Sequence, residues 1–145
     1  MELDVKKLRS GAVLPTRGSR LSAGYDLYAC LDSPVTIAPG ETAPVGTGLA
    51  FALPEGWFAA LFARSGLAAR EGLRPANCVG VCDADYRGEY IIPLHNDSGE
   101  KRTVEPGERI AQMILLPCQE LTFRERDALD DTARGGNGFG STGKK

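Results

Sequence analysis

The polar segment from Gly80 to Gly88 carries the residues best suited to catalysis. Asp83, Asp85 and Tyr86 follow one another closely, just before a glycine turn. A carboxylate held beside an electrophilic phosphorus can act as a general base on water. The same residues also fit an ordinary hairpin with polar side chains at its tip, so this segment alone leaves both interpretations open.

A second segment has the composition of a phosphate site. Arg64-Ser65-Gly66 precedes Leu67–Glu71, a run rich in helix formers. The first N–H groups of a helix favour phosphate, and an arginine adds a planar fork of donors. The structural alternative is a serine that caps the helix beside a surface arginine.

The C-terminal segment Arg134–Gly143 holds five glycines in ten residues. Glycine-rich backbone can fold round phosphates because no Cβ blocks the approach. Arg134 supplies charge, Ser141 and Thr142 supply hydroxyls, and Phe139 supplies a face that could stack on a base. The alternative is a flexible terminus, because such a composition buries little apolar area by itself.

Two isolated polar residues complete the candidates. Gln112 is the only polar side chain between Ile110 and Leu116, and a polar group in an apolar strand needs a partner from the protein or from a ligand. Asp26, in the segment Ser22–Leu27, either enters a strand from a turn or supports another group of the site indirectly.

Short elements with frequent turns must bring these candidates together. Turn signals such as Ala38-Pro39-Gly40-Glu41 and Glu105-Pro106-Gly107-Glu108 recur at short intervals. Short apolar or alternating runs lie between the turns and predict the strands of a sandwich or barrel. They are Val35–Ile37, Gly48–Leu53, Trp57–Phe62, Glu89–Leu94 and Arg109–Leu116. Leu67–Glu71 predicts one short helix of about two turns.

The composition fits one globular domain. The chain has 145 residues, of which 42% are hydrophobic and 25% charged, values that allow a core and are not typical of disorder. A net charge of -2 argues against a surface built for duplex nucleic acid. No apolar run approaches the ~20 residues that cross a bilayer, and the N-terminus lacks the apolar core of a signal peptide. We therefore expect a cytoplasmic protein that binds neither nucleic acid nor membrane.

The cysteines indicate reduced thiols rather than a metal site. Cys78 and Cys82 have the spacing of half a site, but no second pair of Cys or His follows at a suitable spacing, and His95 is the only histidine. Cys30 and Cys118 are isolated in the sequence. We expect all four thiols to fill half-buried strand positions.

Five of these segments, in this order, resemble the five motifs of the trimeric dUTP pyrophosphatase family. The segments are Ala23–Leu27, Arg64–Leu67, Gly80–Gly88, Gly107–Gln112 and Arg134–Gly143. The likeness runs from about residue 15 to the C-terminus. Each motif alone is modest, whereas five in order at family spacing form a specific signal.

The resemblance implies a jelly-roll-like β-barrel with one short helix and a flexible C-terminal arm. The barrel would span residues 1–133 and the glycine-rich arm residues 134–145. Three copies would form a homotrimer in which the arm of one subunit closes the active site of a neighbour. The implied activity is hydrolysis of dUTP to dUMP and pyrophosphate by attack of water on the α-phosphate. This reaction keeps uracil out of DNA and supplies dUMP for dTMP synthesis.

The resemblance also assigns roles to individual residues. Asp83 matches the carboxylate that activates the attacking water. Tyr86 matches the ring that packs against deoxyribose and leaves no room for a 2′-hydroxyl. Asp26 matches a carboxylate that supports the water shell of Mg²⁺, a cofactor held by phosphates and water without a direct protein ligand. The hairpin residues that match the uracil contacts are Asn77, Gly80 and Val81.

Further residues match the remaining substrate contacts of the family. In the body of the protein they are Arg64, Ser65, Gly66 and Gln112. In the arm they are Arg134, Gly140, Ser141 and Thr142, which match the grip on the outer phosphates, and Phe139, which matches the ring that covers uracil.

Three positions depart from the family pattern. Ala63 stands where proline is usual before Arg-Ser-Gly, so that turn is expected to be less rigid. Asn137 interrupts the glycines of the arm, and asparagine tolerates the left-handed conformation better than most residues. His95 occupies a position where a bulky apolar or aromatic residue is usual, and the sequence suggests no role for it.

Two other functions compete with the hydrolase. A dCTP deaminase resembles this family in fold, but it needs a catalytic glutamate near the base and lacks an arm of this composition. A nucleotide-binding regulator of the same fold would sense dUTP or grip a protein partner. Such a regulator would bind dUTP without hydrolysing it, so a measurement of turnover separates the two.

Overall fold

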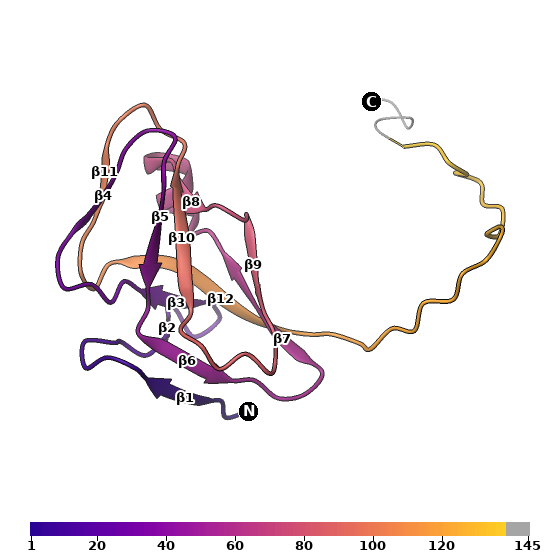
Figure 1. Ribbon diagram of the computed structural model, residues 1–145, viewed down its shortest axis with the longest axis horizontal. Helices are drawn as coiled ribbons and strands as arrows, with labels where there is room; N and C mark the ends of the chain where they lie inside the picture. Colours follow the sequence, from indigo (N-terminus) through magenta and orange to yellow (C-terminus); the bar gives the residue numbers. More distant parts are fainter. Residues whose placement is uncertain (139–145) are drawn as a thin grey trace.

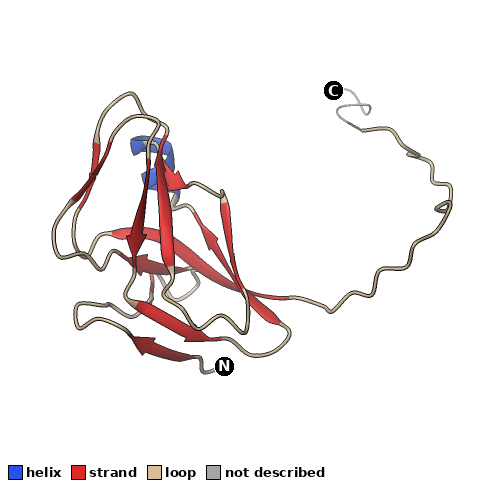
Figure 2. Ribbon diagram, viewed as in Figure 1, coloured by secondary structure: helices blue, strands red, loops and turns tan. Residues whose placement is uncertain are grey.

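The structure is a computed structural model and describes residues 1–138. Strands make up nearly all of its regular secondary structure, and they pair antiparallel throughout the described residues (Figure 2). The all-β class predicted from the sequence is confirmed. The strands form sheets of five, three, two and two strands, and in residues 1–138 these sheets do not join into a closed barrel.

The five-stranded sheet has the long strand β12 (Arg109–Pro117) at its centre. Its order is β2 (Thr16–Arg17), β3 (Tyr25–Tyr28), β12, β7 (Trp57–Phe62) and β9 (Val79–Cys82). Successive side chains of a strand point to opposite faces. In β12, Ala111 and Met113 are buried on the inner face, whereas Gln112 points to the outer face.

Three smaller sheets complete the body (Figure 1). The three-stranded sheet has the order β5 (Thr42–Gly46), β10 (Ile91–Asn96) and β8 (Leu73–Pro75). The two-stranded sheets pair β1 (Asp4–Lys7) with β6 (Leu49–Ala52), and β4 (Val35–Ile37) with β11 (Arg102–Val104). Residues from all four sheets form one core; they include Leu27, Ile37, Val45, Leu49, Leu61, Ile92, Leu94, Val104 and Ile110.

A buried asparagine joins the ends of several strands. The Asn96 side-chain amide donates to the carbonyls of Ile37, at 2.9 Å, and Glu100, at 2.7 Å. Its oxygen accepts from the backbone N–H of Ser98 at 2.9 Å. Because a buried polar side chain without partners would destabilise the core, these bonds are what allow an asparagine at a fully buried position.

The predicted short helix is present as a π-helical turn, η1 (Leu67–Glu71). Leu67 is buried and anchors the turn to the core. Gly72 follows in the left-handed conformation, with φ 70°, and its N–H bonds to the carbonyl of Ala68 at 3.2 Å. This C-cap ends the helix sooner than the two turns expected from composition.

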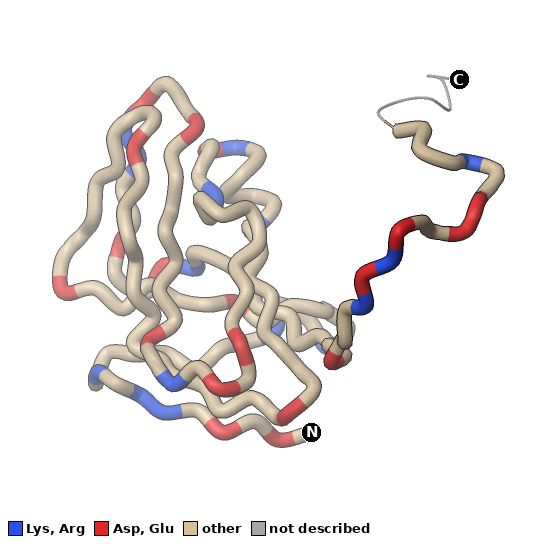
Figure 3. The backbone as a smooth tube through the Cα atoms, turned by 45° about the vertical axis from the view of Figure 1, so that its right-hand side comes forward, with Lys and Arg blue, Asp and Glu red and all other residues tan. Residues whose placement is uncertain are grey.

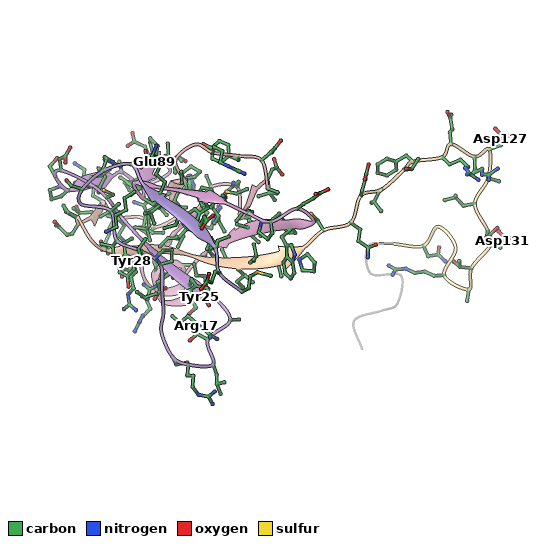
Figure 4. The ribbon with its side chains drawn as sticks, turned by 90° about the horizontal axis from the view of Figure 1, so that it is seen from below. Arg17, Tyr25, Tyr28, Glu89, Asp127 and Asp131 are labelled. Carbon is green, nitrogen blue, oxygen red and sulfur yellow. The ribbon has the colours of Figure 1, made fainter. Side chains whose placement is uncertain are left out.

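Residues 118–138 leave the body as an extended segment (Figure 1). The segment carries exposed apolar side chains, Leu121, Phe123 and Leu129, together with charges of both signs (Figure 3). Asp127 and Asp131 mark its course away from the sheets (Figure 4). Within residues 1–138 no helix has the length and hydropathy to cross a bilayer.

Candidate active site

A pocket of about 250 Å³ lies against β9, the edge strand of the five-stranded sheet. It brings together five residues that the sequence assigns to the nucleoside and to the attacking water. They are Asn77, Gly80, Val81, Asp83 and Tyr86. The third sequence motif is therefore a structural unit within a single chain.

The turn before β9 shapes one wall of this pocket. Cys78 has a left-handed backbone, φ 60°, and the N–H of Val79 bonds back to the carbonyl of Asn77 at 2.6 Å. Gly80 lies opposite Leu61 in the ladder, and a Cβ on Gly80 would meet the Leu61 Cβ at 3.1 Å. The absence of a side chain at Gly80 thus keeps the wall close to the sheet and the pocket open.

Tyr86 also lines the pocket. Its hydroxyl donates to the carbonyl of Glu89 at 3.0 Å. Gly88 lies directly beneath the ring, where an added Cβ would come within 2.4 Å of the Tyr86 hydroxyl oxygen. The ring is still 45% exposed, so one side of it is free to contact a ligand. Gly88 is a site residue that sequence reasoning treated only as a turn.

Two carboxylates line the pocket, and their surroundings differ. Glu89, labelled in Figure 4, accepts from Arg9 at 2.8 Å and from the backbone N–H of Gly48 at 2.7 Å. The Asp83 side chain makes no hydrogen bond or ion pair with any residue in the described part of the chain, and it is exposed. Of the two carboxylates that line the pocket, that of Asp83 is thus the one without a partner among the described residues.

Tyr90 and Cys82 also line the pocket. Sequence reasoning gave Tyr90 no role and treated Cys82 only as a thiol at a half-buried strand position. Burial raises the pKa of the Tyr90 hydroxyl and also that of the Cys82 thiol. Tyr90 is 1% exposed, and its hydroxyl has no hydrogen-bond partner within residues 1–138. The period-two pattern of Tyr90, Ile92 and Leu94 was the signal that could have revealed its burial.

A second group of functional candidates forms a polar cluster where β3, β7 and β12 meet. Asp26 accepts from Arg64 at 2.9 Å and from Arg109 at 3.1 Å. Arg64 also donates to the carbonyl of Arg109 at 3.3 Å. The cluster includes Arg109, which sequence reasoning quoted within a motif but gave no role, although a cation three residues before Gln112 was a usable signal.

Gln112 joins this cluster and finds its partner in the protein backbone. Its amide donates to the carbonyl of Ala63 at 2.9 Å. Gly24 lies against the other end of the amide, because a Cβ there would come within 2.6 Å of the Gln112 oxygen. Ser65 has an exposed side chain and does not cap the helical turn, whose N-cap is Gly66 without a side-chain bond.

Asp83 and Arg64 lie far apart in one chain. In the β7–β9 ladder Cys82 pairs with Ala59, which places Asp83 opposite Phe58. Arg64 lies six positions further along the β7 side, or about 20 Å at the usual rise per residue. At this separation, the side chains of Asp83 and Arg64 in one chain cannot both contact the same phosphate group.

The arm residues are described only in part. Arg134 is exposed, and its Nε donates to the carbonyl of Asn137 at 2.9 Å. Phe139, Gly140, Ser141 and Thr142 lie outside the described residues. The described residues also contain no group of three or more His, Cys, Asp or Glu side chains placed to hold a metal ion.

Comparison with known proteins identifies the family. A family model described as dUTPase matches residues 11–143. The chain belongs to the dUTPase family. The pocket with Asp83 and Tyr86 and the polar cluster around Asp26 both lie within the matched residues.

Curated relatives agree with this assignment. The deoxyuridine 5′-triphosphate nucleotidohydrolase of Hahella chejuensis is 45% identical over 141 residues, which cover 97% of this chain and 93% of the relative. The protein of the same name from Desulfitobacterium hafniense is 50% identical over 131 residues, which cover 90% and 87% of the two chains.

Solved structures share the fold. A variant of the Staphylococcus bacteriophage 80alpha dUTPase with dUpNHpp superposes with a TM-score of 0.89 at 28% identity and covers 98% of both chains. The dUTPase of the Staphylococcus aureus phage phi11 gives a TM-score of 0.81 at 24% identity, covering 91% of this chain and 100% of that one.

Proposed function

We propose that the protein hydrolyses dUTP to dUMP and pyrophosphate by attack of water on the α-phosphate. The observation that carries the proposal is the unpartnered Asp83 carboxylate beside Tyr86 in a pocket of about 250 Å³, in a chain of the dUTPase family. The relatives named as dUTP nucleotidohydrolases and the phage enzyme solved with dUpNHpp support dUTP as the substrate. Such activity keeps uracil out of DNA and supplies dUMP.

In this proposal the pocket binds the nucleoside and prepares the water. Asp83 orients a water molecule and accepts its proton, because its oxygens are not engaged elsewhere in the described residues. Asn77 and the backbone near Gly80 and Val81 offer donors and acceptors to the uracil edge. Tyr86 packs against the sugar, where a rigid ring excludes a 2′-hydroxyl.

The polar cluster binds the triphosphate in the same proposal. Asp26 holds Arg64 and Arg109 side by side, which concentrates positive charge and fixes the direction of both guanidinium groups. Planar forks of this kind match phosphate oxygens. Ser65 and Gly66 stand next to Arg64 with an exposed hydroxyl and a backbone N–H, and Gln112 keeps this strand end in place through Ala63.

Within the proposal, Asp26 also supports the water shell of a magnesium ion that the substrate phosphates hold. Asp26 uses each carboxylate oxygen once, for Arg64 and for Arg109, and a carboxylate has further lone pairs for metal-bound water. Mg²⁺ keeps several waters and is commonly held through substrate phosphates. When bound, it would offset charge on the phosphates that the arginines contact.

We propose that the complete site forms between copies of the chain in the homotrimer of the family. The separation of about 20 Å between the register positions of Asp83 and Arg64 supports this arrangement. So does the outer face of the five-stranded sheet, which carries a set of apolar side chains that no element in the described part of the chain covers fully. They are Phe58, Phe62, Val79, Val81, Ile114 and Leu116.

The C-terminal segment supplies the last part of the proposed site. Residues 134–145 would close the pocket of a neighbouring copy, with Arg134, Gly140, Ser141 and Thr142 on the phosphates and Phe139 over uracil. The course of residues 118–138 away from their own body supports a role on another subunit. The four free cysteines support a reducing compartment such as the cytoplasm.

A single assay tests the function. Purified protein is incubated with Mg²⁺ and with dUTP, dTTP, dCTP or dATP in turn, and the products are separated. We expect dUMP and pyrophosphate from dUTP alone. Release of ammonia from dCTP would indicate a deaminase instead, and tight binding of dUTP without turnover would indicate a regulator.

A further inference from the structure

Three aromatic rings connect the core to the nucleoside pocket. Phe51, on β6, packs against Tyr90 with ring centroids 4.5 Å apart and the ring planes tilted by 48°. Tyr90 in turn stacks against Tyr86, with ring centroids 6.1 Å apart and an interplanar angle of 27°. Both separations fall in the range of favourable aromatic pairs. The exposed wall of the pocket therefore rests on a buried ring.

Tyr90 is held far more firmly than the ring it supports. Its backbone N–H donates to the carbonyl of Leu49 at 2.8 Å. Its own carbonyl accepts from the backbone N–H of Thr47 at 3.1 Å and from the Thr47 side-chain hydroxyl at 2.8 Å. The side chain is 1% exposed, whereas that of Tyr86 is 45% exposed. Tyr90 therefore belongs to the core and also contacts the ring of Tyr86.

The position of Tyr86 matters because its proposed task is steric. To exclude a 2′-hydroxyl, the Tyr86 ring must keep its position when a ribonucleotide enters the pocket. A displacement of about 1 Å in a site is enough to change reaction rates strongly. The hydroxyl bond of Tyr86 to Glu89 holds only the tip of the ring. Tyr90, which also lines the pocket, packs against the ring itself with the centroids 6.1 Å apart.

We propose that Tyr90 is a positioning residue that sets the discrimination between deoxyribose and ribose by holding the Tyr86 ring in place. This inference rests on the proposed function, since it concerns the sugar of the same nucleotide. The supporting contribution comes from the aromatic ring of Tyr90 and not from its hydroxyl, which has no partner within residues 1–138.

The test compares variants that keep or remove the ring. Tyr90→Phe keeps the ring and serves as the matched control. Tyr90→Met fills much of the same volume without a rigid ring, and Tyr90→Leu is a second non-aromatic variant of different shape. For the full chain with Mg²⁺, kcat/KM is measured for dUTP and for UTP. The ratio of the two values does not depend on the fraction of folded protein, because that fraction cancels.

We expect the dUTP-to-UTP ratio of Tyr90→Phe to stay within about twofold of wild type, and that of Tyr90→Met and Tyr90→Leu to fall by about tenfold or more, mainly through improved use of UTP. An unchanged ratio in both non-aromatic variants would overturn the proposal. An equal loss in Tyr90→Phe would overturn it as well, by assigning the effect to the hydroxyl.

Failure of the proposed function gives a different result. Wild-type protein that does not hydrolyse dUTP rejects the hydrolase, whereas normal dUTP hydrolysis with unaltered ratios rejects only the role of Tyr90. Dissociation constants of dUMP and UMP, measured by calorimetry on the same proteins, decide the role of Tyr90 without any turnover. Loss of the dUMP preference in Tyr90→Met, with retention in Tyr90→Phe, is the expected result.

Discussion

Three carboxylates near the site differ in what their oxygens already contact. Glu89 is engaged by Arg9 and a backbone N–H, and Asp26 bridges two arginines. Asp83 alone of the three has no such partner in the described residues. The first two carboxylates therefore build the site, whereas the third is free to take part in chemistry.

This difference predicts separate outcomes for two similar substitutions. We expect Asp83→Asn to lower kcat for dUTP by about 10²–10⁴-fold, the usual contribution of a general base, with an unchanged midpoint of unfolding. Glu89→Gln is the control, since it should lower the free energy of unfolding by about 1–2 kcal/mol through its weakened bonds. Rates from steady-state assays and urea melts of both variants provide the comparison. Wild-type turnover in Asp83→Asn would remove this residue from the mechanism.

The cysteines should react in the order of their exposure and acidity. Cys78 and Cys118 are exposed, Cys30 is buried, and burial raises the pKa of Cys82. Because the thiolate is the reactive form, the raised pKa leaves less of it on Cys82 near neutral pH, and the alkylation rate of Cys82 should keep rising at higher pH than for an ordinary thiol. Peptide mass spectrometry after timed iodoacetamide treatment measures the order. Labelling of Cys82 as fast as Cys78 at pH 7 would contradict this expectation.

At the scale of elements, the sequence predicted best the strands whose own pattern is strong. Val35–Ile37 and Trp57–Phe62 coincide with β4 and β7, and Arg109–Leu116 is one residue shorter than β12. The polar strand β1 (Asp4–Lys7) was not predicted, because only pairing with the distant β6 makes it a strand. Short edge strands of this kind depend on a partner rather than on their own composition.

The sequence likewise predicted those parts of the candidate site whose residues lie close together in the chain. The residues of the third motif are local in sequence, so the pocket around Asp83 followed from one segment. Tyr90 was missed because its role comes from packing against Phe51 and Tyr86, residues that the sequence alone does not place together. Arg109 was missed because its meaning depends on Asp26, which lies on another strand.

Two glycines with the same backbone conformation should respond differently to alanine. Gly40 and Gly48 have φ values of 75° and 67°, but a Cβ on Gly40 meets nothing, whereas one on Gly48 would lie 2.8 Å from the Cβ of Ala12. Gly40→Ala should lower the free energy of unfolding by about 1–2 kcal/mol, the cost of a left-handed alanine. Gly48→Ala should lower the free energy of unfolding by this amount and by about 1–3 kcal/mol more, because the added methyl group overpacks the core. Urea titrations of both variants test the difference, and equal losses would show that the core yields at Ala12.

At the scale of the whole molecule, the outer face of the five-stranded sheet exposes apolar side chains to solvent. Val81 is 63% exposed and Val79 40%, and both lie in register with the apolar side chains of β7 on the same face. Contiguous apolar surface of this kind marks association sites. The face also runs from the polar cluster toward the strand end near Asp83, so covering it with another copy would bring both halves of the site together.

We therefore expect a homotrimer in solution. Light scattering should report three times the 15.4 kDa mass of one chain at micromolar concentration. Val81→Lys on the outer face should weaken association, because a buried unpaired charge is strongly unfavourable. Lys101, which is exposed on a loop, offers Lys101→Glu as the control without effect on mass. A 15.4 kDa species for the wild type would contradict the proposal.

Removal of the arm should impair catalysis far more than folding. A chain that ends at residue 133 keeps every strand and all core residues found in residues 1–138, so its melting temperature should stay close to that of the full chain. Its kcat/KM for dUTP should fall steeply, since the proposed contacts of Arg134, Phe139, Ser141 and Thr142 are gone. Phe139→Trp adds a fluorescence signal that should change on binding dUpNHpp. Full activity in the shortened chain would show that the arm has no part in the reaction.

The central position of β12 also governs how the chain can be made. Both neighbours of this strand, β3 and β7, are translated long before it, and neither can pair with it until residues 109–117 have left the ribosome. Until then β3 and β7 have unsatisfied edges, which favour pairing between different nascent chains. The main sheet therefore assembles late in synthesis, and ribosome stalling just before residue 109 should leave a species that needs chaperones.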